Sequence, residues 1–350
     1  MKDGIERMTK TNAGRFFEDY TIGQVIEHAV PRTVGQGERA LYHALYPARH
    51  ALYSSDAFAQ SCGLAASPLD DLAAFHVVFG KTVPDVSLNA RANLGYAEGR
   101  WLKPVWPGDT LRSTSEVIGL KQNSNGKTGV VWVRTRGYNQ KDECVLDYVR
   151  WVMVKKRDLE AKAPETVVPD LKSALDVSDL VTPEGLDFTN YDFTLAGEPH
   201  RWGDYEVGEV IDHVDGVTVE EAEHMMATRL WQNTSKVHFD GTQREDGKRL
   251  IYGGHVISMA RTLSFNGLAN AQMIAGLNAG AHANPCFSGD TIRAWTEVLD
   301  KAETGAPGVG ALRLRLVATK SGEAGQLKGD GGKYLPGVLL DLDYWALIPV

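Results

Sequence analysis

The sequence predicts an α+β protein made of two copies of one unit. Residues 19–28 match residues 204–213, with six of ten positions identical. Residues 104–112 match residues 285–293, and both share a Gly-Asp-Thr turn. The two matches occur in the same order, at an offset of 185 that falls to 181. A repeated order at a nearly constant offset indicates an internal duplication.

The elements follow the same order in each half. An extended entry with a glycine turn comes first, at Gly23 or Gly208, and a helical stretch follows at residues 36–45 or 220–230. A longer helix comes next. In the second half its buried face is indicated by apolar residues at i, i+3, i+4 and i+7, namely Val256, Met259, Ala260 and Leu263. The first-half counterparts are Leu69, Leu72, Ala73 and His76.

Alternating strands end each half. The patterns predict strands at residues 128–136 and 147–155, and at 310–319 and 338–348, with a hairpin loop at 322–337. One central helix and several late antiparallel strands make each half an α+β unit. We therefore expect a first unit at residues 1–155, a crossover linker at 156–197 that packs on the surface, and a second unit at 198–350.

Composition and charge bound the classes of function. Of 350 residues, 43% are hydrophobic and 23% are charged, as in ordinary globular proteins. The net charge of −8 argues against a nucleic-acid partner. No apolar run is long enough for a membrane helix, and the first fifteen residues lack a signal-peptide core. The three scattered cysteines have no metal spacing, so a cytoplasmic protein without a bound metal is expected.

A polar pair near the middle of the second half is the candidate catalytic site. Asn233 and His238 lie five residues apart, and Gly253, Gly254 and His255 open the long helix that follows. Such a histidine is often structural, an asparagine often forms a turn, and paired glycines often serve packing. At the repeat offset of 185, however, His238 falls on Tyr53. A packing role would be kept in both copies, so the second half is the predicted catalytic half.

These residues resemble the MaoC-type dehydratases, the R-specific enoyl-CoA hydratases, in their double hot-dog form. The family's loop Gly-Asp-x-Asn-Pro-Leu-His aligns with residues 232–238, so that its Asp falls on Asn233 and its His on His238. Residues 45–60, 93–96 and 251–255 are similar to the mesaconyl-CoA (2-methylfumaryl-CoA) hydratase branch, also called β-methylmalyl-CoA dehydratase. The resemblance implies reversible hydration of the mesaconyl-CoA thioester, with coenzyme A present only as part of the substrate. A homo-oligomer that binds a small acyl-CoA is expected.

The resemblance also implies roles for single residues. His238 would move the proton, Asn233 would hold the water, and amides at Gly253, Gly254 and His255 would bind the thioester oxygen. Because Asn233 replaces an aspartate and cannot act as a base, either His238 works alone or another carboxylate, such as Asp240, takes that part. Asp240 could equally be a helix cap.

The free carboxylate of a mesaconyl group calls for a cation or a strong donor. The sequence offers Arg49, His50, Tyr53, Arg229 and Lys236 as candidates. Two other functions stay open at this point. The first is a hot-dog thioesterase, and the second is a non-catalytic acyl-CoA-binding module. Itaconyl-CoA and plain enoyl-CoA stay open as substrates.

Overall fold

The computed structural model describes residues 10–350 and contains one ten-stranded antiparallel sheet, in the order β1-β3-β4-β5-β2-β7-β10-β9-β8-β6. The strands of the first half are β1 (Val25–Thr33), β2 (Ala90–Trp101), β3 (Thr110–Gln122), β4 (Thr128–Tyr138) and β5 (Cys144–Lys155). Those of the second half are β6 (Val210–Thr218), β7 (Met273–His282), β8 (Thr291–Glu303), β9 (Val309–Thr319) and β10 (Val338–Pro349). The order in one half mirrors the order in the other.

The helices fall into two groups along the chain. Those before the linker are α1 (Gln36–Leu45), α2 (Ala51–Ser54), α3 (Asp56–Ser61) and α4 (Asp71–Thr82). The linker contains α5 (Phe193–Ala196), and the second half contains α6 (Glu221–Leu230), α7 (Lys236–Phe239), α8 (Gly253–Leu263) and α9 (Phe265–Leu268). The helices α1, α2 and α4 thus correspond to α6, α7 and α8.

The two halves meet about a pseudo-two-fold axis. The strands β2 and β7 join the two half-sheets, and Ala97 of β2 pairs with Ala279 of β7. On the helical layer His76 of α4 lies 2.8 Å from Ser258 of α8, between the imidazole Nε2 and the hydroxyl Oγ. Each of these pairs joins positions that are equivalent in the repeat. The duplication seen in the sequence is therefore also a duplication in space.

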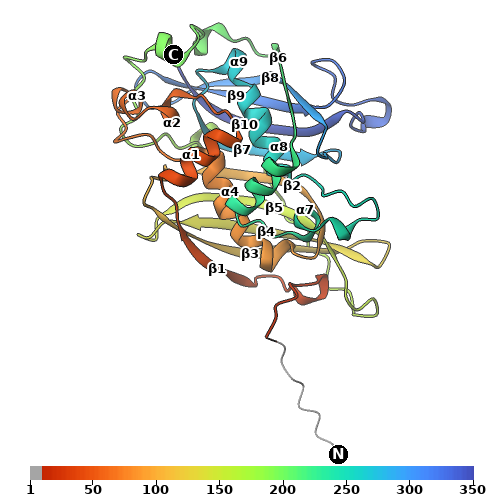
Figure 1. Cartoon of the computed structure of the whole chain (residues 1–350). Coiled ribbons are helices and arrows are strands. Elements are labelled where there is room, and N and C mark those ends of the chain that lie inside the picture. The colour runs from red at the N-terminus through yellow and green to blue at the C-terminus, as the bar shows by residue number, and fades with distance from the viewer. Residues whose placement is uncertain (1–9) are drawn as a thin grey trace, which may run out of the picture.

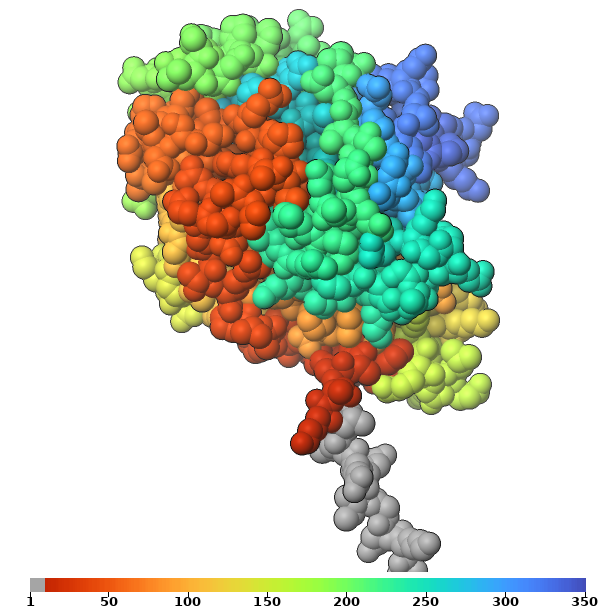
Figure 2. Space-filling model, viewed as in Figure 1, coloured from red at the N-terminus to blue at the C-terminus, as the bar shows by residue number. Residues whose placement is uncertain are grey.

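The long helices α4 and α8 lie on one face of the sheet (Figure 1). Every residue of α4 is buried, and one hydrophobic core spans both halves. Figure 2 shows the α1–α3 region and the segment around α6 and α7 side by side over this face. Each covering segment reaches the other half. Leu52 donates its N–H to the Gln272 side chain, and Lys236 contacts Asn89.

The predicted elements are largely confirmed. The α+β class and the helix at residues 36–45 are confirmed. All four predicted strands are present, and their ends lie within two residues of the predicted ends, except that β5 starts three residues earlier. The predicted helical stretch from residue 220 begins at Glu221, because Glu220 is its N-cap. The predicted amphipathic stripes were too narrow, since α4 and α8 are buried on almost all sides.

The linker packs on the protein through a few apolar side chains. It contains one 3₁₀ turn and α5, and Leu186, Phe188 and Tyr191 join a hydrophobic cluster with β7 and β10. The exact unit boundaries stay a prediction, and residues 1–9 of the first unit lie outside the described residues. In the described chain, none of the helices is long and apolar enough to cross a membrane.

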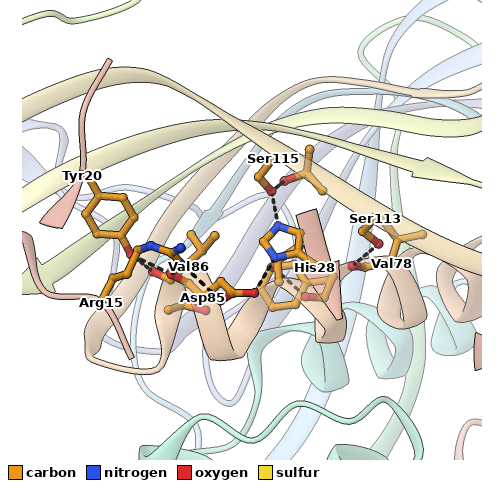
Figure 3. Close-up of polar contacts among 12 residues, drawn as sticks. Arg15, Tyr20, His28, Val78, Asp85, Val86, Ser113 and Ser115 are labelled. Carbon is orange, nitrogen blue, oxygen red and sulfur yellow. Dashed lines mark hydrogen bonds and ion pairs between the residues drawn. The ribbon is translucent and has the colours of Figure 1, made fainter. Parts of the chain in front are cut away.

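A polar network anchors the π-helical turn Val83–Ser87, which continues α4. The Asp85 carboxylate accepts a hydrogen bond from Arg15 at 3.0 Å and lies 2.9 Å from Nδ1 of His28 (Figure 3). The other nitrogen of His28 contacts Ser115 on β3 at 2.8 Å. Tyr20 donates to backbone carbonyls of the same turn. Arg15, Tyr20 and His28 therefore hold the turn in place.

Candidate active site

One cavity of about 260 Å³ lies between the two halves, and the predicted catalytic loop forms one wall of it. The second half contributes Asn233, His238 and the start of α8 at Gly253. The first half contributes the end of α4, the π-helical turn and parts of β2 and β5. A ligand in this cavity would therefore touch both copies of the repeat.

His238 lies on α7 with its ring facing the cavity. Its Nδ1–H donates to the Leu250 carbonyl at 2.7 Å, because a carbonyl oxygen can only accept. This bond fixes the neutral tautomer and leaves Nε2 as a free lone pair. Burial lowers the pKa of His238 to about 4, although the bond to Leu250 opposes that shift. At neutral pH the residue is thus an uncharged base.

Other rings pack behind His238 and fix its position. The ring centres of His224 and His238 lie 6.1 Å apart, and those of His238 and Tyr252 lie 5.7 Å apart. The Tyr252 N–H donates to Nε2 of His224 at 2.9 Å. Burial lowers the pKa of His224 to about 2, so this ring is also neutral. His224 of α6 thus bonds to the residue before α8 and also packs against the ring of His238.

We expect activity to persist to unusually low pH. The basic form of a histidine exists above its pKa, and the pKa of His238 is lowered to about 4 from an ordinary value near 6.5. The acid limb of the kcat/KM profile should therefore have its midpoint well below 6. Initial rates between pH 4 and 8, with circular dichroism at each pH to follow folding, measure this. A midpoint near 6.5 in folded protein would show that the ring is not desolvated.

Asn233 is held in a tight turn next to α4. Its N–H donates to the Thr228 carbonyl at 2.9 Å, and its side-chain oxygen accepts from the Ser235 N–H at 3.2 Å. Gln232 before it has a φ of 55°, an unusual conformation for a residue other than glycine. A Cβ on Gly80 of α4 would lie 1.8 Å from the Trp231 carbonyl oxygen. Gly80 is therefore required for this loop to approach α4.

The first turn of α8 offers two free amides. The N–H of His255 already donates to the Tyr252 carbonyl at 2.9 Å. Within the described chain the N–H groups of Gly253 and Gly254 have no such partner, as is usual for the first residues of a helix. Gly253 lines the cavity, whereas Gly254 packs against the rings of Tyr252 and His76. Of the three predicted donors, Gly253 and Gly254 therefore have free N–H groups, and of these two Gly253 is the one that lines the cavity.

The imidazole of His255 does not reach the cavity. Its Nδ1 lies 2.8 Å from the Tyr46 hydroxyl, and burial lowers its pKa to about 4. Asp240 is exposed, and its carboxylate accepts from the Thr242 N–H at 2.9 Å as the cap of a 3₁₀ turn. Among the described residues that line the cavity there is no Asp or Glu. The structure thus favours the cap for Asp240, and the described cavity wall offers imidazoles but no carboxylate as candidate bases.

Three of the residues predicted to bind the substrate carboxylate lie instead at the position in the first half that corresponds to the cavity. Tyr53, the counterpart of His238, donates to the carboxylate of Asp71, which is the counterpart of Gly253. His50 accepts from the Arg261 guanidinium at 2.7 Å, and Arg49 stacks 4.3 Å above the Phe265 ring.

These contacts fill the twin site with side chains. Burial raises the pKa of Asp71 to about 7 and lowers that of His50 well below its usual value. The assignment of Arg49, His50 and Tyr53 to the substrate is therefore wrong for this cavity, because the pseudo-two-fold axis puts them on its other side. Arg229, another candidate, is exposed and does not line the cavity either.

A group of cations lies where the cavity meets solvent. Arg91 lines the cavity and is exposed. The pKa of Lys155 is lowered by partial burial and by the nearby charges of Arg91 and Lys236. The Lys236 Nζ lies 3.4 Å from the Asn89 side-chain oxygen. Lys236 is thus close to the cavity entrance without lining the cavity itself.

Several cavity residues were given no role from the sequence, although Asn93 and Tyr96 lie in the segment 93–96 on which the family resemblance partly rests. They are His282, Tyr96, Asn93, Asn284 and Arg150. Nε2 of His282 lies 3.2 Å from the Tyr96 hydroxyl, and burial lowers the pKa of His282 to about 4. For Arg150 a signal was present. Arg150 is on the inward-facing side of β5, where every second residue is buried, and it lies between the buried Tyr148 and Val152.

The model of the mesaconyl-CoA hydratase family matches residues 1–329 of this chain. The mesaconyl-CoA hydratase of Cereibacter sphaeroides is 77% identical over 341 residues, which cover 97% of this chain and 99% of that protein.

The chain belongs to the mesaconyl-CoA hydratase family.

A second curated member of the mesaconyl-CoA hydratase family and a solved structure agree. The β-methylmalyl-CoA dehydratase of Chloroflexus aurantiacus is 59% identical over 346 residues, which cover 97% of this chain and 98% of that protein. A crystal structure of a MaoC domain dehydratase from the same organism superposes with a TM-score of 0.95 at 57% identity, covering 98% of this chain and 99% of that one. This mesaconyl-CoA hydratase family member is therefore a hydro-lyase of the MaoC type.

The double hot-dog fold is confirmed as well. A Mycobacterium tuberculosis protein described as having a double hotdog fold superposes with a TM-score of 0.75 at 24% identity, covering 96% of this chain and 98% of that one. In the mesaconyl-CoA hydratase family member described here, the mirrored strand order and the paired helices α4 and α8 are that architecture.

Proposed function

We propose that His238 is the acid/base group with which this chain adds water to mesaconyl-CoA to give β-methylmalyl-CoA. The observation that carries this role is its hydrogen bond to the Leu250 carbonyl, which turns a free Nε2 lone pair toward the cavity. The low pKa keeps that lone pair available at neutral pH. The described cavity wall has no carboxylate that could serve instead.

In the proposed reaction, Nε2 of His238 accepts a proton from water as the oxygen bonds to Cβ. The electron pair of the double bond moves to the thioester, which becomes an enolate. The protonated His238 then donates this proton to Cα. One water molecule has been added across the double bond, and the imidazole is neutral again. The enzyme needs no redox cofactor for these steps, and coenzyme A takes part only as the carrier of the acyl group.

The enolate oxygen is the proposed ligand of the first turn of α8. The free N–H groups of Gly253 and Gly254 and the helix dipole both favour negative charge at this position. Because a glycine has no side chain, the substrate carbonyl can approach the backbone of Gly253 closely. This donor pair stabilises the charge that develops in the transition state more than that of the resting thioester.

Asn233 is the proposed holder of the attacking water. Its side-chain oxygen accepts from the Ser235 N–H, and Asn233 lines the cavity together with His238. We expect Asn233→Asp to keep between about 1% and 50% of wild-type kcat, because a carboxylate can also hold water but repels the enolate. Steady-state rates with mesaconyl-CoA measure this. A folded variant without detectable turnover would contradict a purely orienting role.

The cations at the entrance are the proposed ligands of the coenzyme A phosphates. Arg91, Lys155 and Lys236 lie close together there, on a chain whose net charge is −8. A local cationic group can attract an anionic ligand even when the protein is acidic overall. This arrangement would leave the pantetheine arm to enter the cavity between β2 and the loop before α8.

A thioesterase with a cysteine nucleophile is disfavoured by the state of Cys286, the one thiol that lines the cavity in the described chain. Burial raises the pKa of Cys286 to about 12, so that it is a protonated thiol at neutral pH and a poor nucleophile. A serine bonded to His238 or a water-activating carboxylate would be the alternative. The imidazole of His238 bonds to the Leu250 carbonyl rather than to Ser87 or Ser235 of the cavity wall, and the described wall has no carboxylate.

The test of the function uses purified protein and mesaconyl-CoA. We expect the absorbance of the conjugated thioester to fall to an equilibrium value, and mass spectrometry to show a product heavier by one water. A thiol reagent should detect no free coenzyme A. Release of thiol would show hydrolysis, and tight binding without a change in mass would show a binding module. Either result would overturn the proposed mechanism.

The setting of the enzyme is also proposed. The three cysteines are free, which agrees with a reducing compartment such as the cytoplasm. A homo-oligomer is proposed from the family resemblance. These two proposals do not affect the chemistry above.

A further inference from the structure

Arg150 is a buried cation without a carboxylate partner. It lies on β5, its side chain is fully buried, and it lines the cavity. Among residues 10–350 it forms no ion pair, and neither its Nε nor its Nη1 has a hydrogen-bond partner. A buried charge normally has a partner, because removing it from water costs several kcal/mol. This guanidinium therefore needs an explanation.

Other arginines of the sheet show what a purely structural role looks like here. Arg134 on β4 is within 3.4 Å of the Asp147 carboxylate, and Arg313 on β9 donates to Asp343 at 2.6 Å. The buried Arg261 of α8 bonds to His50, to Ser264 and to backbone carbonyls. Arg150 differs from all of them, since two of its three nitrogens are unused.

The protein holds Arg150 in place from one side only. Its Nη2 donates to the Thr82 hydroxyl at 2.7 Å, and its guanidinium carbon lies 4.2 Å above the Phe79 ring centre. Nη2 also contacts Ser87 at 3.4 Å, and Ser87 belongs to the π-helical turn that the Asp85 network fixes (Figure 3). The side chain is therefore positioned, while Nε and Nη1 keep their capacity to bind an anion.

A second unpartnered polar group lies on the same wall. Neither the nitrogen nor the oxygen of the Asn93 side chain has a hydrogen-bond partner in the described chain, and Asn93 also lines the cavity. Asn93 is on β2, which pairs with β5, and Tyr96 of β2 is the direct partner of Arg150. Few buried polar groups in native proteins lack a partner, and a polar ligand is one reason for an exception.

We propose that Arg150, assisted by Asn93, binds the free carboxylate of the mesaconyl group. This inference rests on the proposed function, because it requires the acyl group to lie in this cavity. The carboxylate is attached to Cβ, the carbon that water attacks. Its pairing with a guanidinium fixes Cβ relative to His238 and offsets the negative charge that would oppose the attack. Arg150 thus determines specificity for an acyl group with a terminal carboxylate.

The test compares two substrates that differ only at the carboxylate. In 2-methylcrotonyl-CoA a methyl group replaces the carboxylate of mesaconyl-CoA, and the coenzyme is unchanged. We expect Arg150→Met to lower kcat/KM for mesaconyl-CoA by about 10²–10³-fold. For 2-methylcrotonyl-CoA, kcat/KM, or the inhibition constant where turnover is too slow, should change less than threefold. Arg136→Met, which removes an ion-paired guanidinium from β4, is the matched control and should affect neither substrate.

The outcomes separate the possible roles of Arg150. An equal loss with both substrates would show a coenzyme A phosphate contact or a structural role and would overturn the proposal, as would unchanged activity. Thermal melting adds an independent readout, because removing an unpaired buried charge should leave Tm unchanged or raise it. Arg150→Lys keeps the charge but not the planar fork of the guanidinium. Its kcat/KM for mesaconyl-CoA should fall less than that of Arg150→Met, and this difference should not occur with 2-methylcrotonyl-CoA. His238→Ala should lose both substrates, so that a failure of the proposed mechanism is recognised separately.

Discussion

Replacement of His238 by alanine should lower kcat by about 10²–10⁴-fold, the usual effect of a lost general acid/base. The ring lies in the cavity with its Nδ1 fixed by Leu250, so its removal takes away the base without removing part of the hydrophobic core. The fold should be kept, and the KM for mesaconyl-CoA should change much less than kcat. The residual rate can be measured at high enzyme concentration from the absorbance of the conjugated thioester.

A matched control for this experiment is His200→Ala, since His200 is exposed and outside the cavity. This variant should keep wild-type kcat and Tm. Added imidazole offers a further readout, because it can enter the space left in His238→Ala and restore part of the rate. Wild-type turnover by folded His238→Ala would remove this residue from the mechanism, and His282 would then be the other imidazole of the cavity to consider.

Replacement of Gly253 by alanine should lower kcat by about 10²-fold, the size of effect expected when reacting groups are displaced by about 1 Å. A Cβ at this position would lie 2.3 Å from the ring of His282. Either the ring or the first turn of α8 must then move, and the proposed oxyanion donors move with the turn. Gly37→Ala in α1 is the control, because nothing lies within 4 Å of a Cβ there.

The cause of the Gly253→Ala effect can be checked in the background of His282→Ala. If the ring is what the new methyl group meets, Gly253→Ala should cost less than tenfold when that ring is absent. A loss of about 10²-fold in both backgrounds would show that the methyl group obstructs the substrate directly. The comparison needs only kcat values of the four proteins.

The sequence was sufficient for the architecture because its repeat and its strand patterns are local signals. Alternation along residues 147–155 and the matching turns at Gly108 and Gly289 need no knowledge of contacts. It could also be predicted that His238 and the start of α8 lie near each other, since both belong to one unit, and both line the cavity. The repeat even assigned Tyr53 as the counterpart of His238, and α2 and α7 begin with nearly the same backbone angles.

The rest of the cavity could not be predicted, because it is formed across the pseudo-two-fold axis. Arg49, His50 and Tyr53 precede α4 just as the catalytic loop precedes α8, and sequence alone does not say that they face the twin site. Arg150 reaches the cavity only because β5 and β2 of one unit lie beneath the loop of the other. A charged residue at an inward-facing strand position was the one available sign, and its meaning required the contacts.

The filled twin site has an evolutionary consequence. In a symmetric homodimer, every substitution appears at both copies of the interface, so a site cannot acquire an arginine on one side without losing something equivalent on the other. Fusion of the two units removes that constraint. In this chain Asp71 and Arg261 fill one half of the interface, while the other half contains the proposed carboxylate ligand Arg150 and the proposed base His238 in one cavity. The proposed recognition of a dicarboxylic acyl group therefore depends on an asymmetry that two covalently linked units permit and two identical ones do not.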